Sequence, residues 1–133
     1  MLRIFANSKL VAFASLLAGC GGEPATTQLS EAAQRGMLIF EANCAACHKL
    51  GPEGTNIAPT LGGIVGREAG VEDFNYSPAL KSATFTWTPE KIDAFLASPR
   101  ESVPGNQMAF YGLEDAAERS DLISLLQHHS ASD

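Results

Sequence analysis

The fold of this 133-residue chain depends on one stretch, Cys44-Ala45-Ala46-Cys47-His48. Its Cys-x-x-Cys-His spacing is the attachment signature of a c-type haem. Residues three apart in a helical turn lie on one face, so both sulfurs can reach the same edge of a porphyrin. The histidine that follows is then placed to bind the iron. The stretch predicts one covalent haem c, with Cys44 and Cys47 as thioether positions and His48 as an iron ligand.

Two other uses of paired cysteines compete with this interpretation. A thioredoxin-like redox pair needs a strand–helix–strand pattern around it, and the sequence shows no convincing run of strands. A structural zinc site needs further ligands at motif spacing, and only Cys20, His128 and His129 remain for that role. The haem interpretation is favoured because its attachment signature is complete.

The first residues are typical of a secretion signal. Arg3 and Lys9 give a positive start, and an apolar run over 10–18 follows. This run is too short to cross a bilayer, which takes about 20 residues in a helix. It ends in Leu17-Ala18-Gly19-Cys20, which resembles the lipobox of bacterial lipoproteins. In that family the signal is cut before the cysteine, and the cysteine sulfur takes a lipid.

This resemblance predicts a signal peptide over 1–19, a lipidated Cys20 and a tether over 20–29, followed by one domain over 30–133. The alternative is ordinary cleavage with an incidental cysteine, which would give a soluble periplasmic protein. A flexible tether of this length spans roughly 15–18 Å. We therefore expect an extracytoplasmic, membrane-anchored protein that faces the periplasm. Gly21, in place of the aspartate associated with inner-membrane retention, tilts the choice toward an outer membrane.

The net charge restricts the classes of partner. The chain has 9 basic and 15 acidic residues, a formal charge of −6. Removing Arg3 and Lys9 with the signal leaves 7 basic residues and a charge near −8. Because there is no basic stripe, nucleic-acid binding has no electrostatic basis. An acidic surface favours a basic or locally polar partner. Glu72 and Asp73 are expected to form a solvated acidic face, and His128 and His129 are expected to be exposed tail residues.

The pattern of caps and glycines predicts an all-α fold with four or so short helices and long loops. Ser30, Ser77 and Thr88 are good N-caps, the last two followed by proline at the first helical position. The expected helices cover residues 31–43, 78–83, 89–98 and 114–128. The glycine-rich stretch over 49–70 reads as loop. Such long loops are unusual in a small domain, and wrapping around one large apolar cofactor would explain them.

The second axial ligand of the iron is predicted to be Met108. Histidine and methionine together are the ligands of electron-transfer cytochromes. Met108 follows Pro104-Gly105, a turn that could present its thioether rigidly. Met37 lies in the expected first helix and is more typical of packing. A lone methionine is ordinarily a gap-filling core residue, and only the haem context favours a ligand.

With these residues in view, the chain resembles a class I cytochrome c of the mitochondrial or bacterial c2 type, over about residues 30–130. Gly36-Met37-Leu38-Ile39-Phe40 resembles the Gly-x-x-x-Phe of that family's first helix. There the glycine lets the last helix cross closely, and Leu122 and Leu125 would supply the contact. Pro104-Gly105-x-x-Met108 resembles the family's methionine-ligand loop.

The resemblance also implies a set of residues around the haem. Pro59 would accept a hydrogen bond from the other nitrogen of the histidine ligand. Arg67 would lie near a propionate, and Tyr76 and Trp87 would donate hydrogen bonds to one. Phe95 stands where relatives often have a tyrosine whose hydroxyl approaches the methionine sulfur.

The implied function is single-electron transfer in a respiratory or photosynthetic chain, so catalytic residues are not expected and the protein is expected to be no enzyme. The implied partners are a quinol–cytochrome c oxidoreductase, a terminal oxidase or a periplasmic reductase, approached by a monomer. The alternative is a haem enzyme or gas sensor with a labile sixth ligand. Phe95 keeps that alternative open, because phenylalanine has no hydroxyl to donate a hydrogen bond to the methionine sulfur.

Overall fold

The computed structural model describes residues 28–131. The expected signal peptide, Cys20 and nearly all of the expected tether lie outside the described residues. Leu29, which we expected in the tether, instead contacts the hydrophobic core. The side-chain amide of Gln34 also donates to the Leu29 carbonyl oxygen, at 2.9 Å. The globular part therefore includes Leu29.

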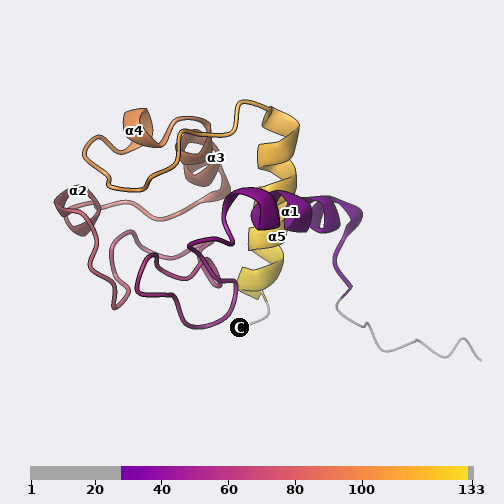
Figure 1. Ribbon diagram of the computed structural model, residues 1–133, viewed down its shortest axis with the longest axis horizontal. Coiled ribbons are helices and arrows are strands. Elements are labelled where there is room, and N and C mark those ends of the chain that lie inside the picture. Colours follow the sequence, from indigo (N-terminus) through magenta and orange to yellow (C-terminus); the bar gives the residue numbers. More distant parts are fainter. Residues whose placement is uncertain (1–27, 132–133) are drawn as a thin grey trace, which may run out of the picture.

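The fold is all-α, as predicted, and its elements are shown in Figure 1. The helices are α1 (Glu31–Asn43), α2 (Pro78–Lys81), α3 (Pro89–Ala97), α4 (Pro99–Ser102) and α5 (Ala116–Ala131). Within residues 28–131 the β structure is a single isolated bridge between Glu68 and Thr86. None of the helices in this range is long and apolar enough to cross a membrane.

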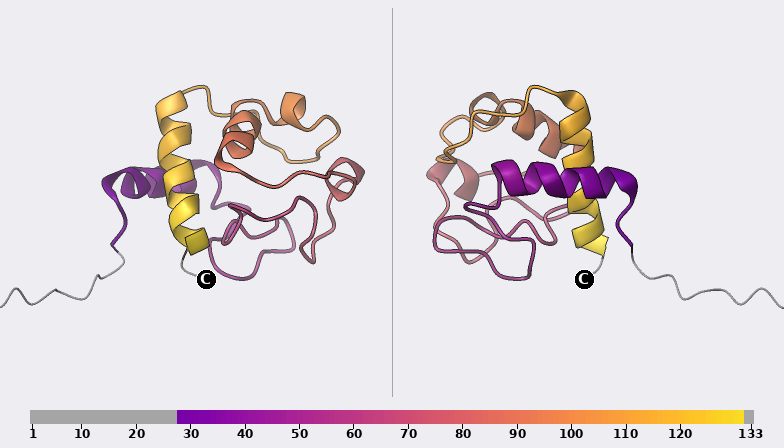
Figure 2. Two further views of the ribbon diagram at one scale, coloured as in Figure 1. Left: turned by 180° about the vertical axis from the view of Figure 1, so that it is seen from behind. Right: turned by 45° about the vertical axis from the view of Figure 1, so that its right-hand side comes forward.

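The first and last helices cross each other at a glycine, and Figure 2 shows the crossing from two sides. A Cβ atom on Gly36 would lie 2.8 Å from the carbonyl carbon of Asp121, closer still to its oxygen, and 3.0 Å from Cβ of Leu125. The close crossing at Gly36 and the contact from Leu125 are therefore confirmed. The nearest atoms belong to the Asp121 backbone, and not to Leu122, which is buried.

The predicted caps explain where three helices begin. The side-chain oxygens of Ser30, Ser77 and Thr88 accept hydrogen bonds from backbone N–H groups three residues on, at 3.1, 3.3 and 3.2 Å. These bonds satisfy N–H groups that have no partner inside the helix.

Several helix boundaries differ from the prediction, and α2 already ends at Lys81. Pro99 ends α3 but also begins α4, since proline suits the first position of a new helix. The last helix begins later than expected, because the Asp115 carboxylate accepts from the Ala117 N–H at 2.7 Å and caps it. It also continues through His128 and His129, which we expected to be an exposed tail. Both histidines are half-buried in its last turn.

The long loops are attached to the helical core. The Gly63 N–H donates to the His129 carbonyl at 3.3 Å, and the Val65 N–H donates to Oγ of Ser130 at 3.0 Å. In Figures 1 and 2 the loops lie together on one side of the crossed pair α1 and α5. The glycine-rich segment is thus held against the last turn of α5.

Candidate haem-binding site

The Cys-x-x-Cys-His segment continues from α1 as an irregular helical turn. The Cys44 N–H donates to the Phe40 carbonyl at 2.8 Å, and the N–H groups of Cys47 and His48 donate to the Cys44 carbonyl at 3.0 and 2.9 Å. Cys44 is buried and Cys47 is exposed, and the two thiols do not form a disulfide. Burial raises the pKa of the Cys44 thiol to about 11. The turn therefore presents two thiols of different exposure directly before the histidine.

The His48 ring is fixed by a backbone acceptor. Its Nδ1 lies 2.8 Å from the carbonyl oxygen of Pro59, the residue predicted for this contact. A carbonyl only accepts, so Nδ1 carries the proton and Nε2 keeps its lone pair. Burial lowers the pKa of His48, and the bond to Pro59 partly offsets this effect. The result is a neutral imidazole of defined tautomer, the form that binds a metal.

The loop that carries Met108 is held by an asparagine next to a turn. The side-chain oxygen of Asn106 accepts from the Met108 N–H at 3.1 Å. Its side-chain nitrogen donates to the carbonyls of Pro99 and Val103 at 2.8 and 2.9 Å. Gly105 has φ of +86°, a conformation that favours glycine. Met108 is half-buried in this constrained loop.

Arg67 is bound inside the loops rather than exposed. Its guanidinium donates to the carbonyl oxygens of Thr60 and Gly62, at 2.7 and 3.0 Å. It also forms an ion pair with Glu72. We expected Glu72 and its neighbour Asp73 to form a solvated acidic face, and this is wrong for Glu72. The pairing was missed because nothing in the sequence marks Glu72 as the partner of Arg67.

Tyr76 and Trp87 are half-buried and lie in aromatic contacts. Tyr76 meets Phe74 edge to face, with ring centroids 5.1 Å apart. Trp87 lies between Phe85 and Phe95, at centroid distances of 4.8 and 5.1 Å. Each ring also carries a polar donor, the O–H or the indole N–H, which suits a propionate. Their contact with a propionate stays a prediction.

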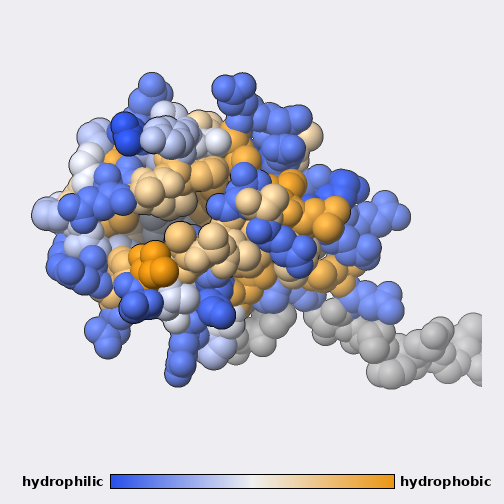
Figure 3. All heavy atoms as spheres, in the orientation of Figure 1, coloured by the Kyte–Doolittle hydropathy of each residue, from blue (hydrophilic) through white to orange (hydrophobic). Residues whose placement is uncertain are grey.

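The surface is hollowed where the loops face one another. Figure 3 shows this hollow on the left of the molecule, bordered by apolar side chains above and below. Partly buried apolar residues from the loops, including the methionine loop, pack against the core: Leu50, Leu61, Val65, Trp87 and Phe110. Two thiols, an oriented imidazole, a constrained thioether and an apolar surround are the donor set and environment that a haem c requires.

The two competing interpretations of the cysteines lack structural support. A thioredoxin-like site needs strands on either side of the motif, and the described part of the chain has only the isolated bridge. A structural zinc site needs a group of ligands, and among residues 28–131 no three or more His, Cys, Asp or Glu side chains are grouped to hold a metal ion.

Comparison with known proteins agrees with the geometry. Residues 33–130 match the family model described as cytochrome c. Cytochrome c of Tetrahymena pyriformis is 42% identical over 105 residues, 79% of this chain and 95% of that protein. The c-type cytochrome cy of Rhodobacter capsulatus is 43% identical over 106 residues, 78% of this chain but 51% of that protein.

A solved structure shares both sequence and fold. Cytochrome cH from Methylobacterium extorquens is 35% identical and superposes with a TM-score of 0.67, covering 71% of this chain and 96% of that one. The family match covers nearly all of the described residues. This chain belongs to the cytochrome c family, whose members carry covalently attached haem c with its iron.

Proposed function

We propose that this chain is a single-electron carrier, with haem c attached through Cys44 and Cys47 and its iron ligated by His48 and Met108. Bound haem c supplies one iron that alternates between the ferrous and ferric states. The protein supplies the ligands and a low-polarity surround. No substrate site is needed for this task, so no catalytic residue is assigned.

The observation that carries the proposal is the hydrogen bond from Nδ1 of His48 to the Pro59 carbonyl. It leaves Nε2 as the only ring nitrogen able to bind the iron. Such a bond also holds the ring at a fixed orientation. A ligand with a fixed ring suits a centre that changes its charge but not its coordination.

The second support is the construction of the Met108 loop. Asn106 joins this loop to the residues around α4 through two hydrogen bonds and accepts a third from the Met108 N–H. A loop held in this way keeps the thioether in place in both redox states. Methionine ligation raises the reduction potential, which suits a carrier that accepts electrons from a quinol-oxidising complex.

We further propose that the carrier works outside the cytoplasm, tethered by a lipid on Cys20. The support is the lipobox-like sequence before Cys20 and the apolar run that precedes it. Tethering would raise the effective concentration of the carrier beside membrane redox complexes. A quinol–cytochrome c oxidoreductase, a terminal oxidase or a periplasmic reductase would be the partner. The acidic net charge favours a docking surface on that partner that is basic or locally polar.

The test is an optical and potentiometric titration of the protein made in cells with working haem-ligation machinery. We expect a c-type haem spectrum that survives denaturation and one reversible one-electron transition. Colourless protein would overturn the assignment.

One observation keeps a second function in view, a haem enzyme or gas sensor. Phe95 is buried against Trp87 and offers no hydroxyl to the Met108 sulfur. Rapid binding of carbon monoxide to the untreated reduced protein would favour this second function over the carrier.

A further inference from the structure

The ion pair between Arg67 and Glu72 closes a short turn, because the two residues are five positions apart in the loop before α2. The Arg67 guanidinium donates hydrogen bonds to the carbonyls of Thr60 and Gly62, and the Glu72 carboxylate pairs with it from five positions further along. Thr60 directly follows Pro59, whose carbonyl accepts a hydrogen bond from Nδ1 of His48. The ion pair and the His48 ring are therefore bound to neighbouring carbonyl groups, those of Thr60 and Pro59.

Both charges of this pair are largely shielded from water. The exposed fraction of the side chain is 15% for Arg67 and 23% for Glu72. Charges in such a position act over longer distances than surface charges do, because water and salt screen them less. The net charge of the pair is close to zero while both groups are present. Loss of the carboxylate would leave an uncompensated positive charge at this place.

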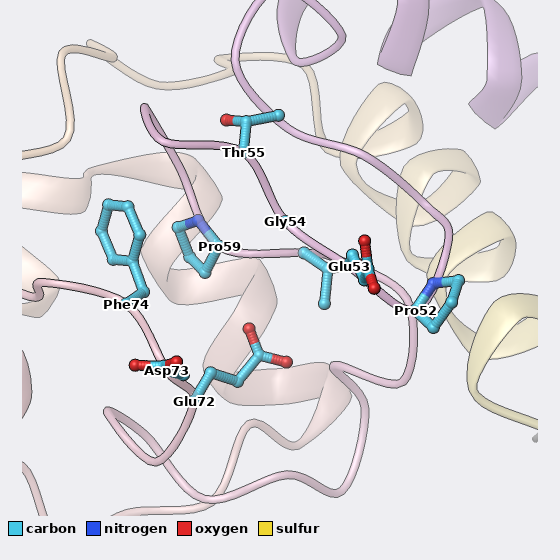
Figure 4. Close-up of a pocket in the computed structure, with 9 residues that line it drawn as sticks. Pro52, Glu53, Gly54, Thr55, Pro59, Glu72, Asp73 and Phe74 are labelled. Carbon is cyan, nitrogen blue, oxygen red and sulfur yellow. The ribbon is translucent and has the colours of Figure 1, made fainter.

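The charges of Arg67 and Glu72 also affect the pKa of a neighbouring side chain, Tyr76. Burial raises the pKa of Tyr76, the negative charge of Glu72 raises it further, and the positive charge of Arg67 lowers it. The phenol is thus within electrostatic reach of both charges. Glu72 also lines a cavity of about 430 Å³ with Pro59, and Figure 4 shows both side chains.

We propose that Glu72 sets the reduction potential of this protein by offsetting the positive charge of Arg67. The inference rests on the proposed electron-carrier function. The ferric state carries one more positive charge than the ferrous state, so a nearby positive charge favours reduction. The negative charge of Glu72 therefore lowers the reduction potential, because it offsets the positive charge of Arg67.

Glu72→Gln removes the charge and keeps the shape of the side chain. At a fixed one-electron reference couple, we expect the ratio of reduced to oxidised protein to rise roughly threefold to tenfold. Asp73→Asn is the matched control, because Asp73 is the next residue, loses the same charge and is exposed. Figure 4 shows the two carboxylates pointing in different directions from adjacent positions. We expect Asp73→Asn to change the ratio of reduced to oxidised protein less than about twofold, because water screens the charge of the exposed Asp73 carboxylate.

Glu72→Asp keeps the charge and shortens the side chain. If the charge sets the potential, this variant stays near the wild-type value. If the loop merely needs a side chain of this size, Glu72→Asp shifts the potential and Glu72→Gln does not, and the proposal is wrong.

The pKa of Tyr76 gives a readout that does not depend on electron transfer. The chain has two tyrosines, and Tyr111 is 87% exposed and serves as an internal reference. Nuclear magnetic resonance of ring-labelled tyrosine should show a lower pKa for Tyr76 in Glu72→Gln and no change for Tyr111. If the wild type titrates normally and Glu72→Gln has the same reduction potential, the proposal on Glu72 is wrong but the electron-carrier function stands. A wild type that does not titrate overturns the carrier function instead.

Discussion

Gly36 lies so close to the backbone carbonyl of Asp121 that a side chain at this position would collide with it. We expect Gly36→Ala to destabilise the fold by about 1–3 kcal/mol, the usual cost of overpacking a close contact. This cost outweighs the gain of about 1 kcal/mol in helix propensity that alanine brings. Urea unfolding measures the difference.

Gly51→Ala is the control for this variant, because nothing lies within 4 Å of the added methyl group. We expect its stability to stay within about 0.5 kcal/mol of wild type. Equal destabilisation by both variants would contradict the close crossing.

Asp121 also carries a pH-dependent contribution through its side chain. Arg35 donates to both carboxylate oxygens at 2.7 Å, and this contact lowers the pKa of Asp121 below its usual 3.8. A lowered folded-state pKa gives stability that is fully present above the unfolded value and lost as the pH falls below it. Unfolding of wild type and Arg35→Gln should therefore differ at pH 6 and converge toward pH 3.

Arg35 is 59% exposed, so added salt should shrink the same difference at pH 6. A difference that is independent of both pH and salt would show that Arg35 contributes through packing and not through its charge.

Met108→Ala should open the iron to added ligands and lower the reduction potential, because the thioether that raises it is lost. Carbon monoxide binding and potentiometry measure the two effects. Met37→Leu is the control, since Met37 only contacts the core and leucine conserves its volume. An unchanged spectrum and potential in Met108→Ala would remove Met108 from the site.

Cys20→Ser should release the protein from membranes or block its processing. Fractionation of cells that make each form measures the effect, and mass spectrometry of the wild type reveals the lipid. A wild-type mature protein that is already soluble would show that the lipobox interpretation is wrong.

Much of the fold follows from local signals in the sequence. Ser30, Ser77 and Thr88 cap helices within a residue or two of where they were predicted, because capping depends on neighbours three residues away. The contact between His48 and Pro59 was also predicted, but only through the family resemblance. The two residues are eleven positions apart along a loop, and no periodicity in the sequence predicts such a contact.

The features that were missed are long-range or depend on tertiary context. The pairing of Glu72 with Arg67 depends on how the loop turns between two positions five residues apart, where no helix or strand sets the spacing. The last turn of α5 persists past His128 because the Gly63 and Val65 N–H groups donate to it, from about 65 positions earlier in the chain. The start of α4 at Pro99 was missed for a different reason, since proline stops one helix and starts another with equal ease.

The crossing of α1 and α5 also determines when this polypeptide can fold. Phe40 and its neighbours on α1 stay uncovered until the partner helix exists, and the ion pair that joins them spans 86 positions. Until then the thiols proposed to attach haem remain open to the enzymes of ligation. A chain truncated before Ala116 should be digested quickly by protease and still accept haem. We therefore expect attachment of the cofactor not to require the crossing of α1 and α5, which forms only once α5 has been made.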